Sequence, residues 1–316
     1  MFLPALFAVI CFGFPALLAT TPSPAAELKW VQSDESLELH DGDQLAFSYL
    51  FRSGKKPIIY PLVGPGGESM SRDYPMKPAP EGGTTDHIHQ RSMWMTHGEV
   101  NDIDFWSEGS GSGEIHHREV TSSEVKDGVG SFTATADWKT PDGEVLLSEK
   151  KRIDVRSDAK RRMIDFEIVL TAVADEVHFG DTKEGSFGIR IPDSMMVDRK
   201  LGGTIINAQG DEDKETWGKR SRWVDYTGPV EGETVGITIL EHPESFGHPS
   251  RWHVRSYGLF AANPFGEFHF VGGEQTDGVR IKKGESIRLK YRVVLHQGVG
   301  EVGTIENQWK QFASEL

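Results

Sequence analysis

The segment from residue 86 to residue 106, DHIHQRSMWMTHGEVNDIDFW, concentrates side chains that can do chemistry. His87 and His89 are two residues apart, so on an extended strand both would lie on one face. Arg91 would join them there, and its guanidinium could hold a carboxylate or a developing oxyanion through two parallel hydrogen bonds. The spacing predicts a catalytic group made of His87, His89 and Arg91.

Two kinds of chemistry fit this pair of imidazoles. They can bind a metal ion if a third ligand comes from elsewhere, but no motif with fixed ligand spacing supplies one. A neutral imidazole can also take a proton from a substrate hydroxyl, because it titrates near neutral pH. We favour acid–base chemistry, and the sequence identifies neither a metal nor another cofactor.

Four further residues of the segment are candidates for substrate binding. Trp94 and Trp106 could stack on the apolar face of a sugar ring, although tryptophans more often lie in a core. His97 is a secondary candidate. Asp104 is another, or it is a turn residue that caps backbone amides. The mixture of aromatic and charged side chains is typical of a sugar site.

The segments 183–193 and 116–118 carry further candidates. In KEGSFGIRIPD, Glu184 is a candidate general acid or base. Arg190 is either a second catalytic cation or the ion-pair partner of Glu184. In His116-His117-Arg118, adjacent strand residues point to opposite faces, so at most one of the two histidines can join the first cluster. We include His117 as a candidate for substrate binding.

The segment 241–266, EHPESFGHPSRWHVRSYGLFAANPFG, is the second richest in functional side chains. His253 and Arg255 share a face by alternation. We expect His253 to be catalytic and Arg255 to bind substrate. Asn263, which ends the following strand, is a further candidate for substrate binding.

The elements that must position these residues are predicted to be strands joined by tight turns. Residues 36–51 contain two alternating runs around Asp41-Gly42, and residues 130–155 contain a Pro-Asp-Gly turn between two more. Both patterns are typical of hairpins. Alternation continues to residue 298, whereas helical periodicity is scarce. We therefore expect an all-β fold, a large antiparallel β-sandwich.

One helix is expected at the C-terminal end. Ile305, Trp309, Phe312 and Leu316 recur at helical spacing after Gly303-Thr304, a plausible cap. No repeat of fixed period and no long linker divides the preceding chain. Residues 27–316 are therefore expected to form a single domain.

Residues 1–26 have the composition of a secretion signal. They contain no charged side chain, and an apolar run from Phe2 to Ala19 is followed by small residues suited to cleavage. An uncleaved membrane anchor is the alternative, since a helix of ~20 apolar residues spans a bilayer. We expect a signal peptide and a periplasmic or extracellular protein.

The composition excludes several classes of partner. A net charge of −14 argues against general affinity for nucleic acids, whose phosphates require a basic surface. The single cysteine, Cys11, lies in the expected signal, so the mature chain has no disulfide framework and no thiolate site. No later segment is apolar enough for multi-span membrane insertion. A carbohydrate or another small molecule is the expected ligand, and oligomeric state is not indicated.

Four segments resemble the secreted family labelled PmoA-like. They are residues 60–76, YPLVGPGGESMSRDYPM, together with 86–106, 183–193 and 248–266. Members typically carry DHxHHRGL…GDVNGxDFW and WHxRxYGLxAxNPFG. This sequence departs from that pattern at Gln90-Arg91-Ser92, where the family has His-Arg-Gly, and at Asp102, where it has glycine. The resemblance covers most of the mature chain, and the missing histidine puts a three-histidine site in doubt.

The family label implies a methane oxygenase, after a membrane-bound copper enzyme subunit. A β-rich, strongly acidic chain does not fit such a subunit, so we take the label as a name without a mechanism. The final YRVVLHQG segment is also similar to the galactose-mutarotase-like supersandwich, a fold used by sugar epimerases, lyases and hydrolases. A likeness at the level of fold does not fix function.

We therefore expect a secreted carbohydrate-active protein, a hydrolase, lyase or epimerase that works by acid–base chemistry. A non-catalytic carbohydrate-binding protein is one alternative. A His-rich metalloenzyme, as the PmoA label implies, is the other. The acid–base hypothesis requires that the segments around 87–91, 184–190 and 253–255 meet in the folded chain.

Overall fold

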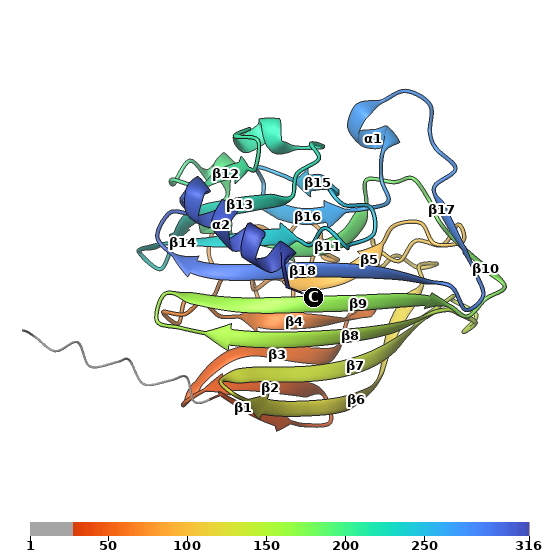
Figure 1. Cartoon of the computed structure of the whole chain (residues 1–316), viewed down its shortest axis with the longest axis horizontal. Coiled ribbons are helices and arrows are strands. Elements are labelled where there is room, and N and C mark those ends of the chain that lie inside the picture. The colour runs from red at the N-terminus through yellow and green to blue at the C-terminus, as the bar shows by residue number, and fades with distance from the viewer. Residues whose placement is uncertain (1–27, 316) are drawn as a thin grey trace, which may run out of the picture.

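The computed structural model describes residues 28–315, and in it two large antiparallel sheets pack face to face (Figure 1). The expected signal peptide, residues 1–26, lies outside the described residues. The first sheet has the order β1-β2-β3-β4-β5-β11-β16-β15. Its strands are β1 (Leu28–Gln32), β2 (Ser36–Asp41), β3 (Gln44–Ser53), β4 (Lys56–Leu62), β5 (Met93–His97), β11 (Gly185–Arg190), β16 (Leu259–Asn263) and β15 (Arg251–Val254).

The second sheet has the order β12-β13-β14-β18-β9-β8-β7-β6. Its strands are β12 (Thr204–Asn207), β13 (Trp223–Val230), β14 (Glu233–Glu241), β18 (Ser286–Gln297), β9 (Arg161–Ala172), β8 (Val145–Ser157), β7 (Val129–Lys139) and β6 (Glu114–Lys126). A separate ribbon pairs β10 (Glu176–Phe179) with β17 (Val279–Lys282). The predicted antiparallel sandwich is confirmed.

Two hairpins show how local sequence sets the register. β2 and β3 pair Asp41 with Gln44, and Gly42 in the connecting turn has a φ of +60°. β7 and β8 pair Lys139 with Val145 around Gly143, whose φ is +89°. Glycine adopts this left-handed conformation without a steric cost, so both turns form where the sequence predicts them.

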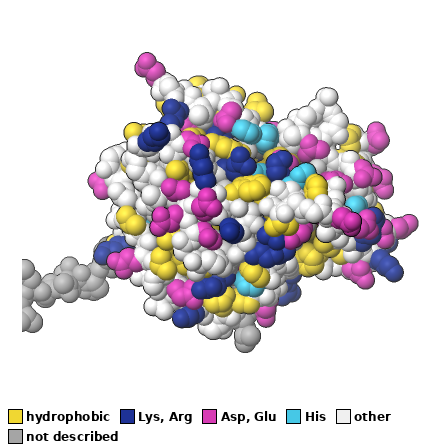
Figure 2. All heavy atoms as spheres, turned by 90° about the horizontal axis from the view of Figure 1, so that it is seen from above, with side chains coloured by type: hydrophobic (Ala, Val, Ile, Leu, Met, Phe, Trp, Pro, Cys, Tyr) yellow, Lys and Arg dark blue, Asp and Glu magenta, His cyan; other side chains and the backbone are white. Residues whose placement is uncertain are grey.

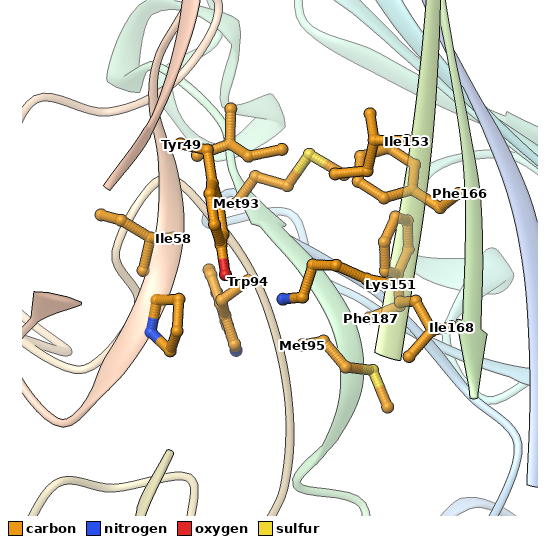
Figure 3. Close-up of a pocket in the computed structure, with 12 residues that line it drawn as sticks. Tyr49, Ile58, Met93, Trp94, Met95, Lys151, Ile153, Phe166, Ile168 and Phe187 are labelled. Atoms are coloured by element: carbon orange, nitrogen blue, oxygen red, sulfur yellow. The ribbon is translucent and has the colours of Figure 1, made fainter. Parts of the chain in front are cut away.

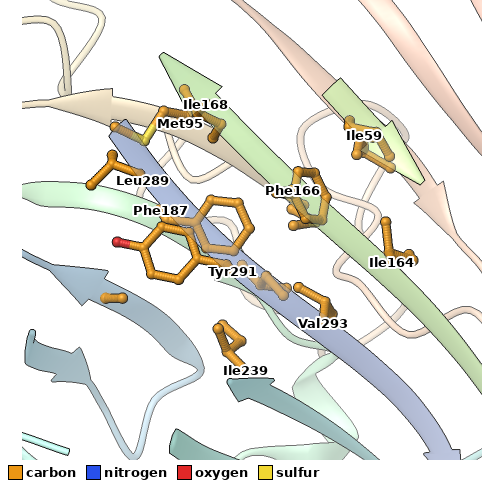
Figure 4. Close-up of a cluster of buried hydrophobic side chains, with 14 of the residues drawn as sticks. Ile59, Met95, Ile164, Phe166, Ile168, Phe187, Ile239, Leu289, Tyr291 and Val293 are labelled. Atoms are coloured by element: carbon orange, nitrogen blue, oxygen red, sulfur yellow. The ribbon is translucent and has the colours of Figure 1, made fainter. Parts of the chain in front are cut away.

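The core lies between the two sheets and is rich in aromatic rings (Figure 4). Along β9, buried and partly exposed residues alternate, which is the pattern of a strand with one face on the core. Phe187 of the first sheet stacks on Tyr291 of the second at 4.5 Å and meets the edge of Phe166 at 5.0 Å. These contacts join the sheets beneath β11, the strand that carries Arg190.

Helices are few and short. The C-terminal helix α2 (Val302–Ala313) buries Ile305 and Phe312 against Trp223 and Leu240 on the outer face of the second sheet. It begins two residues before the expected start, and Leu316 lies outside the described residues. The others are α1 (Phe268–Val271) and 3-10 turns at Asp193–Met195, Val197–Arg199 and Asp213–Thr216. No helix within residues 28–315 is long and apolar enough to cross a membrane.

A charged pair occupies inward-facing positions of β8. Lys151 and Glu149 are buried, and their Nζ and Oε1 atoms are 2.7 Å apart. Glu149 also accepts a hydrogen bond of 2.9 Å from the indole of Trp138. Lys151 lines an internal space beside Tyr49, with its ammonium over the phenol ring (Figure 3). The core of the sandwich therefore contains a buried ion pair.

Candidate functional site

Four strands of the first sheet bring the candidate segments side by side. The register pairs Trp94 of β5 with Gly188 of β11. Gly188 is paired in turn with Ala261 of β16, which pairs with His253 of β15. Directly paired residues share a face, and Trp94 and Ala261 lie in an apolar cluster separate from the core, which holds the adjacent Ala262. This row therefore lies on the outer face of the sheet.

The loop that carries His87 and His89 is fixed by two buried arginines. Asp86 accepts hydrogen bonds from Arg72 at 2.7 Å and from Arg190 at 3.0 Å. Arg72 also donates to the carbonyl oxygens of Asp86 and His87. The ion pairs with Asp86 thus hold both histidines over the outer face, and Arg190 has a positioning role that the sequence did not indicate.

Aromatic contacts connect this loop with β15 and its turn. His87 stacks on Tyr257 with ring centroids 5.1 Å apart and lies 5.6 Å from His89. His89 lies 6.1 Å from Trp106, which meets the edge of Trp94 at 5.4 Å. The two histidines and two tryptophans predicted from the segment 86–106 therefore form one continuous cluster with Tyr257, but both tryptophans are buried in it and do not present a ring face to a ligand as expected.

The Glu184 carboxylate reaches residues from both other segments. Burial lowers the pKa of His89 to about 4, and Glu184 opposes this shift. Burial also lowers the pKa of His253 to about 4, again against Glu184. Burial raises the pKa of Tyr257, and the same carboxylate adds to the rise. The loop that carries Glu184 is joined to His253 through the carbonyl of Lys183, and the Glu184 charge acts on both histidines.

The protonation states suit proton transfer. Both imidazoles are neutral at pH 7, since their pKa values lie near 4. His253 donates from Nδ1 to the carbonyl of Lys183 at 2.8 Å, which leaves Nε2 with a lone pair. Glu184 is about one-third exposed and pairs with Lys183 at 2.9 Å. Two neutral bases and a carboxylate are thus placed together.

A glycine is required where β5 ends, because the Glu184 backbone approaches closely. The amide of Gly98 donates to the carbonyl of Glu184 at 2.6 Å. A Cβ at position 98 would lie 2.7 Å from the Cβ of Glu184. Gly98 therefore allows the backbone of Glu184 to approach the end of β5 this closely.

Several buried donors in this region have no partner. Within residues 28–315, the indole Nε1 atoms of Trp94 and Trp106 and the Nε atom of Arg190 make no hydrogen bond. A buried donor left without a partner costs about 1–3 kcal/mol. These donors are buried, so a ligand cannot reach them in this arrangement of the side chains.

Two predicted residues face away from the cluster. The Arg91 guanidinium pairs with Glu108 at 2.9 Å and donates to Ser53. Residues 87–91 do not form a strand, and His87 has a φ of +45°, so the alternation that placed Arg91 beside the histidines does not hold. His117 stacks on Phe51 at 4.1 Å and lines a different cavity, with His116 and Glu114.

Two other predicted residues stabilise loops. The carboxylate of Asp104 accepts hydrogen bonds from the backbone amides of Trp106 and Ser107, as expected of a turn residue. Asn263 donates to the carbonyl of Thr182 and accepts from the amides of Phe265 and Gly266. Asp104 therefore positions Trp106, and Asn263 fixes the loop that follows β16.

His97 lies on the core side of β5. Its Nε2 donates to the carbonyl of Gly180 at 2.8 Å, and its Nδ1 lies 3.2 Å from the Ser186 hydroxyl. Phe265 packs against the imidazole at 4.9 Å. Burial lowers the pKa of His97 to about 4, so this residue is a neutral hydrogen-bonding group of the interior.

We expect His97 to make the protein sensitive to acid. The folded state holds its pKa near 4, against about 6.5 in the unfolded chain, so the unfolded state binds more protons between these values. This contribution to the free energy of unfolding is complete above pH 6.5. Up to about 3 kcal/mol of it is lost as the pH falls to 4.

Urea denaturation at pH 7 and pH 4.5 tests this expectation. His97→Gln keeps an amide donor for the Gly180 carbonyl but does not titrate, so it should lose less stability on acidification than the wild type. Equal losses in the two proteins would show that other groups cause the acid sensitivity.

Three residues of the cluster were not predicted. Tyr257 lies in the turn after β15, where strand alternation no longer applies, so the sequence pattern did not place it. Lys56 is buried and donates to the carbonyl of His89 at 2.9 Å; burial lowers its pKa to about 8. Trp217 lies 5.7 Å from the Arg255 guanidinium. The sequence around Lys56 and Trp217 gives no signal of either role.

The charge distribution agrees with a polar site. On the face seen in Figure 2, histidine side chains lie among lysine and arginine side chains across the middle of the surface. In the part of the chain that the structure describes, no group of three or more His, Asp or Glu side chains is arranged to hold a metal ion.

A family comparison matches residues 36–310 to the model described as a family of unknown function, DUF6807. The chain belongs to DUF6807. The matched region contains every candidate residue of this DUF6807 protein. The family description names no oxygenase, so the PmoA label stays an expectation. No curated protein matches the sequence.

Solved structures with related architecture are distant. The galactosidase domain of an alpha-galactosidase-sucrose kinase is 8% identical, with a TM-score of 0.37 over 87% of this chain and 41% of that one. Galactose 1-epimerase from Lactobacillus acidophilus NCFM is 8% identical, with a TM-score of 0.43 over 87% of this chain and 100% of that one. A glycoside hydrolase family 97 enzyme from Pseudoalteromonas sp. strain K8 is 11% identical, with a TM-score of 0.36 over 87% of this chain and 35% of that one. The DUF6807 chain therefore spans less than half of two of these proteins, and all three TM-scores lie below 0.5.

Proposed function

We propose that this DUF6807 protein is an exported carbohydrate-active enzyme that performs acid–base chemistry on a sugar. The observation that carries the proposal is that His253 is hydrogen-bonded to the carbonyl of Lys183, next to Glu184, while His87 stacks on Tyr257 in the turn after β15 with His89 beside it. Export is supported by the apolar, uncharged segment at residues 1–26.

The cluster supports a division of roles. A neutral His89 or His253 takes a proton from a sugar hydroxyl or an acidic C–H bond, and Glu184 serves as the opposing acid–base group. Tyr257 is partly exposed beside the histidines and offers an aromatic surface on which a pyranose can pack, whereas Trp94 and Trp106 are buried behind it. Hydrolysis, β-elimination and epimerisation all use such a pair of groups.

Binding without turnover is the second candidate function. It is favoured by the partly exposed Tyr257 beside His87, which can pack on a sugar without any proton transfer. Such a protein would bind a sugar against Tyr257, with histidines that only donate or accept hydrogen bonds. Kinetics of a histidine variant separate the two functions.

We expect His89→Ala to lower turnover at least 10-fold on whichever sugar the wild type converts, because proton transfer by a placed side chain contributes about 10²–10⁴-fold. The test is a panel of free aldoses, glycosides and uronates, followed by NMR for anomerisation, epimerisation, elimination and hydrolysis. His116→Ala is the matched control, since His116 is partly exposed and pairs with Glu114 outside the cluster. Sugar binding with no conversion by the wild type would favour the binding protein, and unchanged turnover in His89→Ala would remove His89 as the base.

A further inference from the structure

Arg255 differs from every other arginine in the described chain. Within residues 28–315, each of the other arginines forms an ion pair with an aspartate or glutamate. The Arg255 guanidinium forms no ion pair and no side-chain hydrogen bond with these residues. In a chain with 48 acidic residues against 34 basic ones, carboxylate partners are abundant. The free guanidinium therefore needs an explanation from its surroundings.

Those surroundings are the candidate site. The Arg255 guanidinium lies 5.5 Å from the ring centroid of Tyr257 and 5.7 Å from that of Trp217. Its charge also lowers the pKa of His253, after the larger effect of burial. Arg255 thus lies beside two of the groups to which we assign sugar binding and proton transfer.

The backbone around Arg255 is fixed. The amide of Arg255 donates to the carbonyl of Leu259 at 2.7 Å, and the amide of Gly258 donates back to the carbonyl of Arg255 at 2.9 Å. Gly258 has a φ of +99°, which glycine adopts at no steric cost. A tight turn thus holds the arginine, and two aromatic rings flank its side chain. A cation held in this way loses little conformational entropy when it binds an anion.

We propose that Arg255 binds a carboxylate of the substrate, so that the site takes acidic sugars of the uronate class. This inference rests on the proposed function and specifies its substrate. One guanidinium edge presents two parallel N–H donors, which match the two oxygens of a carboxylate.

The net charge makes local recognition necessary. At −14, the chain as a whole repels an acidic ligand, so affinity depends on cations at the site. Asp86 pairs with both Arg190 and Arg72, and Glu184 pairs with Lys183. Glu108 pairs with both Lys56 and Arg91. Within residues 28–315, Arg255 is therefore the arginine of the cluster whose guanidinium has no carboxylate partner and is free to pair with a ligand.

Sugars that differ only at C6 test the proposal. Binding of D-galacturonate and D-galactose, and of D-glucuronate and D-glucose, is measured by calorimetry and by quenching of tryptophan fluorescence. The wild type should bind each uronate more tightly than its neutral partner. Arg255→Gln should weaken uronate binding roughly 10- to 100-fold, the range for a hydrogen-bonded ion pair, and change neutral-sugar binding by less than about twofold. Arg255→Lys should recover only part of the loss, because it keeps the charge but not the paired donors.

Arg118→Gln is the control, because Arg118 of β6 is exposed and pairs with Asp137 of β7, outside the cluster. Thermal melting monitors folding of each variant. Equal weakening of uronate and neutral-sugar binding in Arg255→Gln would assign Arg255 a packing role and overturn the proposal. Preference for galactose 6-sulfate over galacturonate would overturn the carboxylate assignment.

These outcomes are separable from those for the catalytic proposal. Uronate binding that depends on Arg255, without conversion, would leave this inference standing and remove the enzyme. Conversion of neutral sugars and uronates at equal rates would support the enzyme and overturn the inference that Arg255 selects uronates.

Discussion

Glu184→Gln is expected to lower kcat by about 100-fold or more on the sugar that the wild type converts. Glutamine has the shape of glutamate but cannot accept or deliver the proton that we assign to this position. Because Glu184 is partly exposed, the variant should fold normally, and sugar affinity should change by less than about threefold. The loss therefore falls on kcat rather than on KM.

Glu244→Gln provides a closely matched control. Glu244 is an exposed glutamate that pairs with Lys290 at 2.9 Å, the same separation as between Glu184 and Lys183, but outside the cluster. It should leave turnover unchanged. A kcat of Glu184→Gln within threefold of the wild type would end the assignment of Glu184 as an acid–base group.

Local sequence patterns predicted the strands and turns, because alternation and turn conformation depend on residues that are close together in the sequence. The alternation in residues 161–172 records which face of β9 meets the core, and the turns at Gly42 and Gly143 need left-handed backbone that glycine supplies. The order of the strands was not predictable in the same way. β5 pairs with β11, and β9 pairs with β18, across long stretches of chain. Such pairing depends on how whole sheet faces pack together in the folded chain, which short sequence patterns do not record.

The candidate site was predictable on strands and directly beside them, and unpredictable in longer loops. Strand periodicity grouped His253 with Arg255, and both lie at the cluster, although β15 ends at Val254 and Arg255 begins the following turn. The same argument misplaced Arg91, because the chain around His87 turns through left-handed backbone and breaks the alternation. Lys56 reaches the loop carbonyl of His89 from a separate strand. Its role follows from the tertiary structure alone.

Prediction of burial from residue type also fails at Glu149 and Lys151, which are charged but occupy inward-facing positions of β8. Alternation places both toward the core, yet their charged types predict exposure. The structure resolves this conflict by pairing them with each other and with Trp138. Burial lowers the pKa of Lys151, but Glu149 outweighs this effect and the net shift is upward, so the ammonium stays charged. Burial raises the pKa of the neighbouring Tyr49 to about 12, so its phenol stays neutral.

Lys151→Met is expected to lower the free energy of unfolding by about 3–5 kcal/mol. Methionine fills a similar volume, so the loss comes from the Glu149 carboxylate, which would remain in the core without its counter-charge. Urea denaturation at pH 7 measures the change. The same measurement on Lys150→Met, whose lysine is exposed on the opposite face of β8, should give a change within about 0.5 kcal/mol.

The double variant Lys151→Met with Glu149→Gln distinguishes a charge effect from a packing effect. Glutamine keeps a carbonyl oxygen for the Trp138 indole but removes the buried charge. If the unpaired carboxylate causes the loss, the double variant should be more stable than Lys151→Met by several kcal/mol, because replacing both members of a buried ion pair is often nearly neutral. A double variant as unstable as Lys151→Met would mean that the lysine chain, and not its charge, supports the sheet at this point.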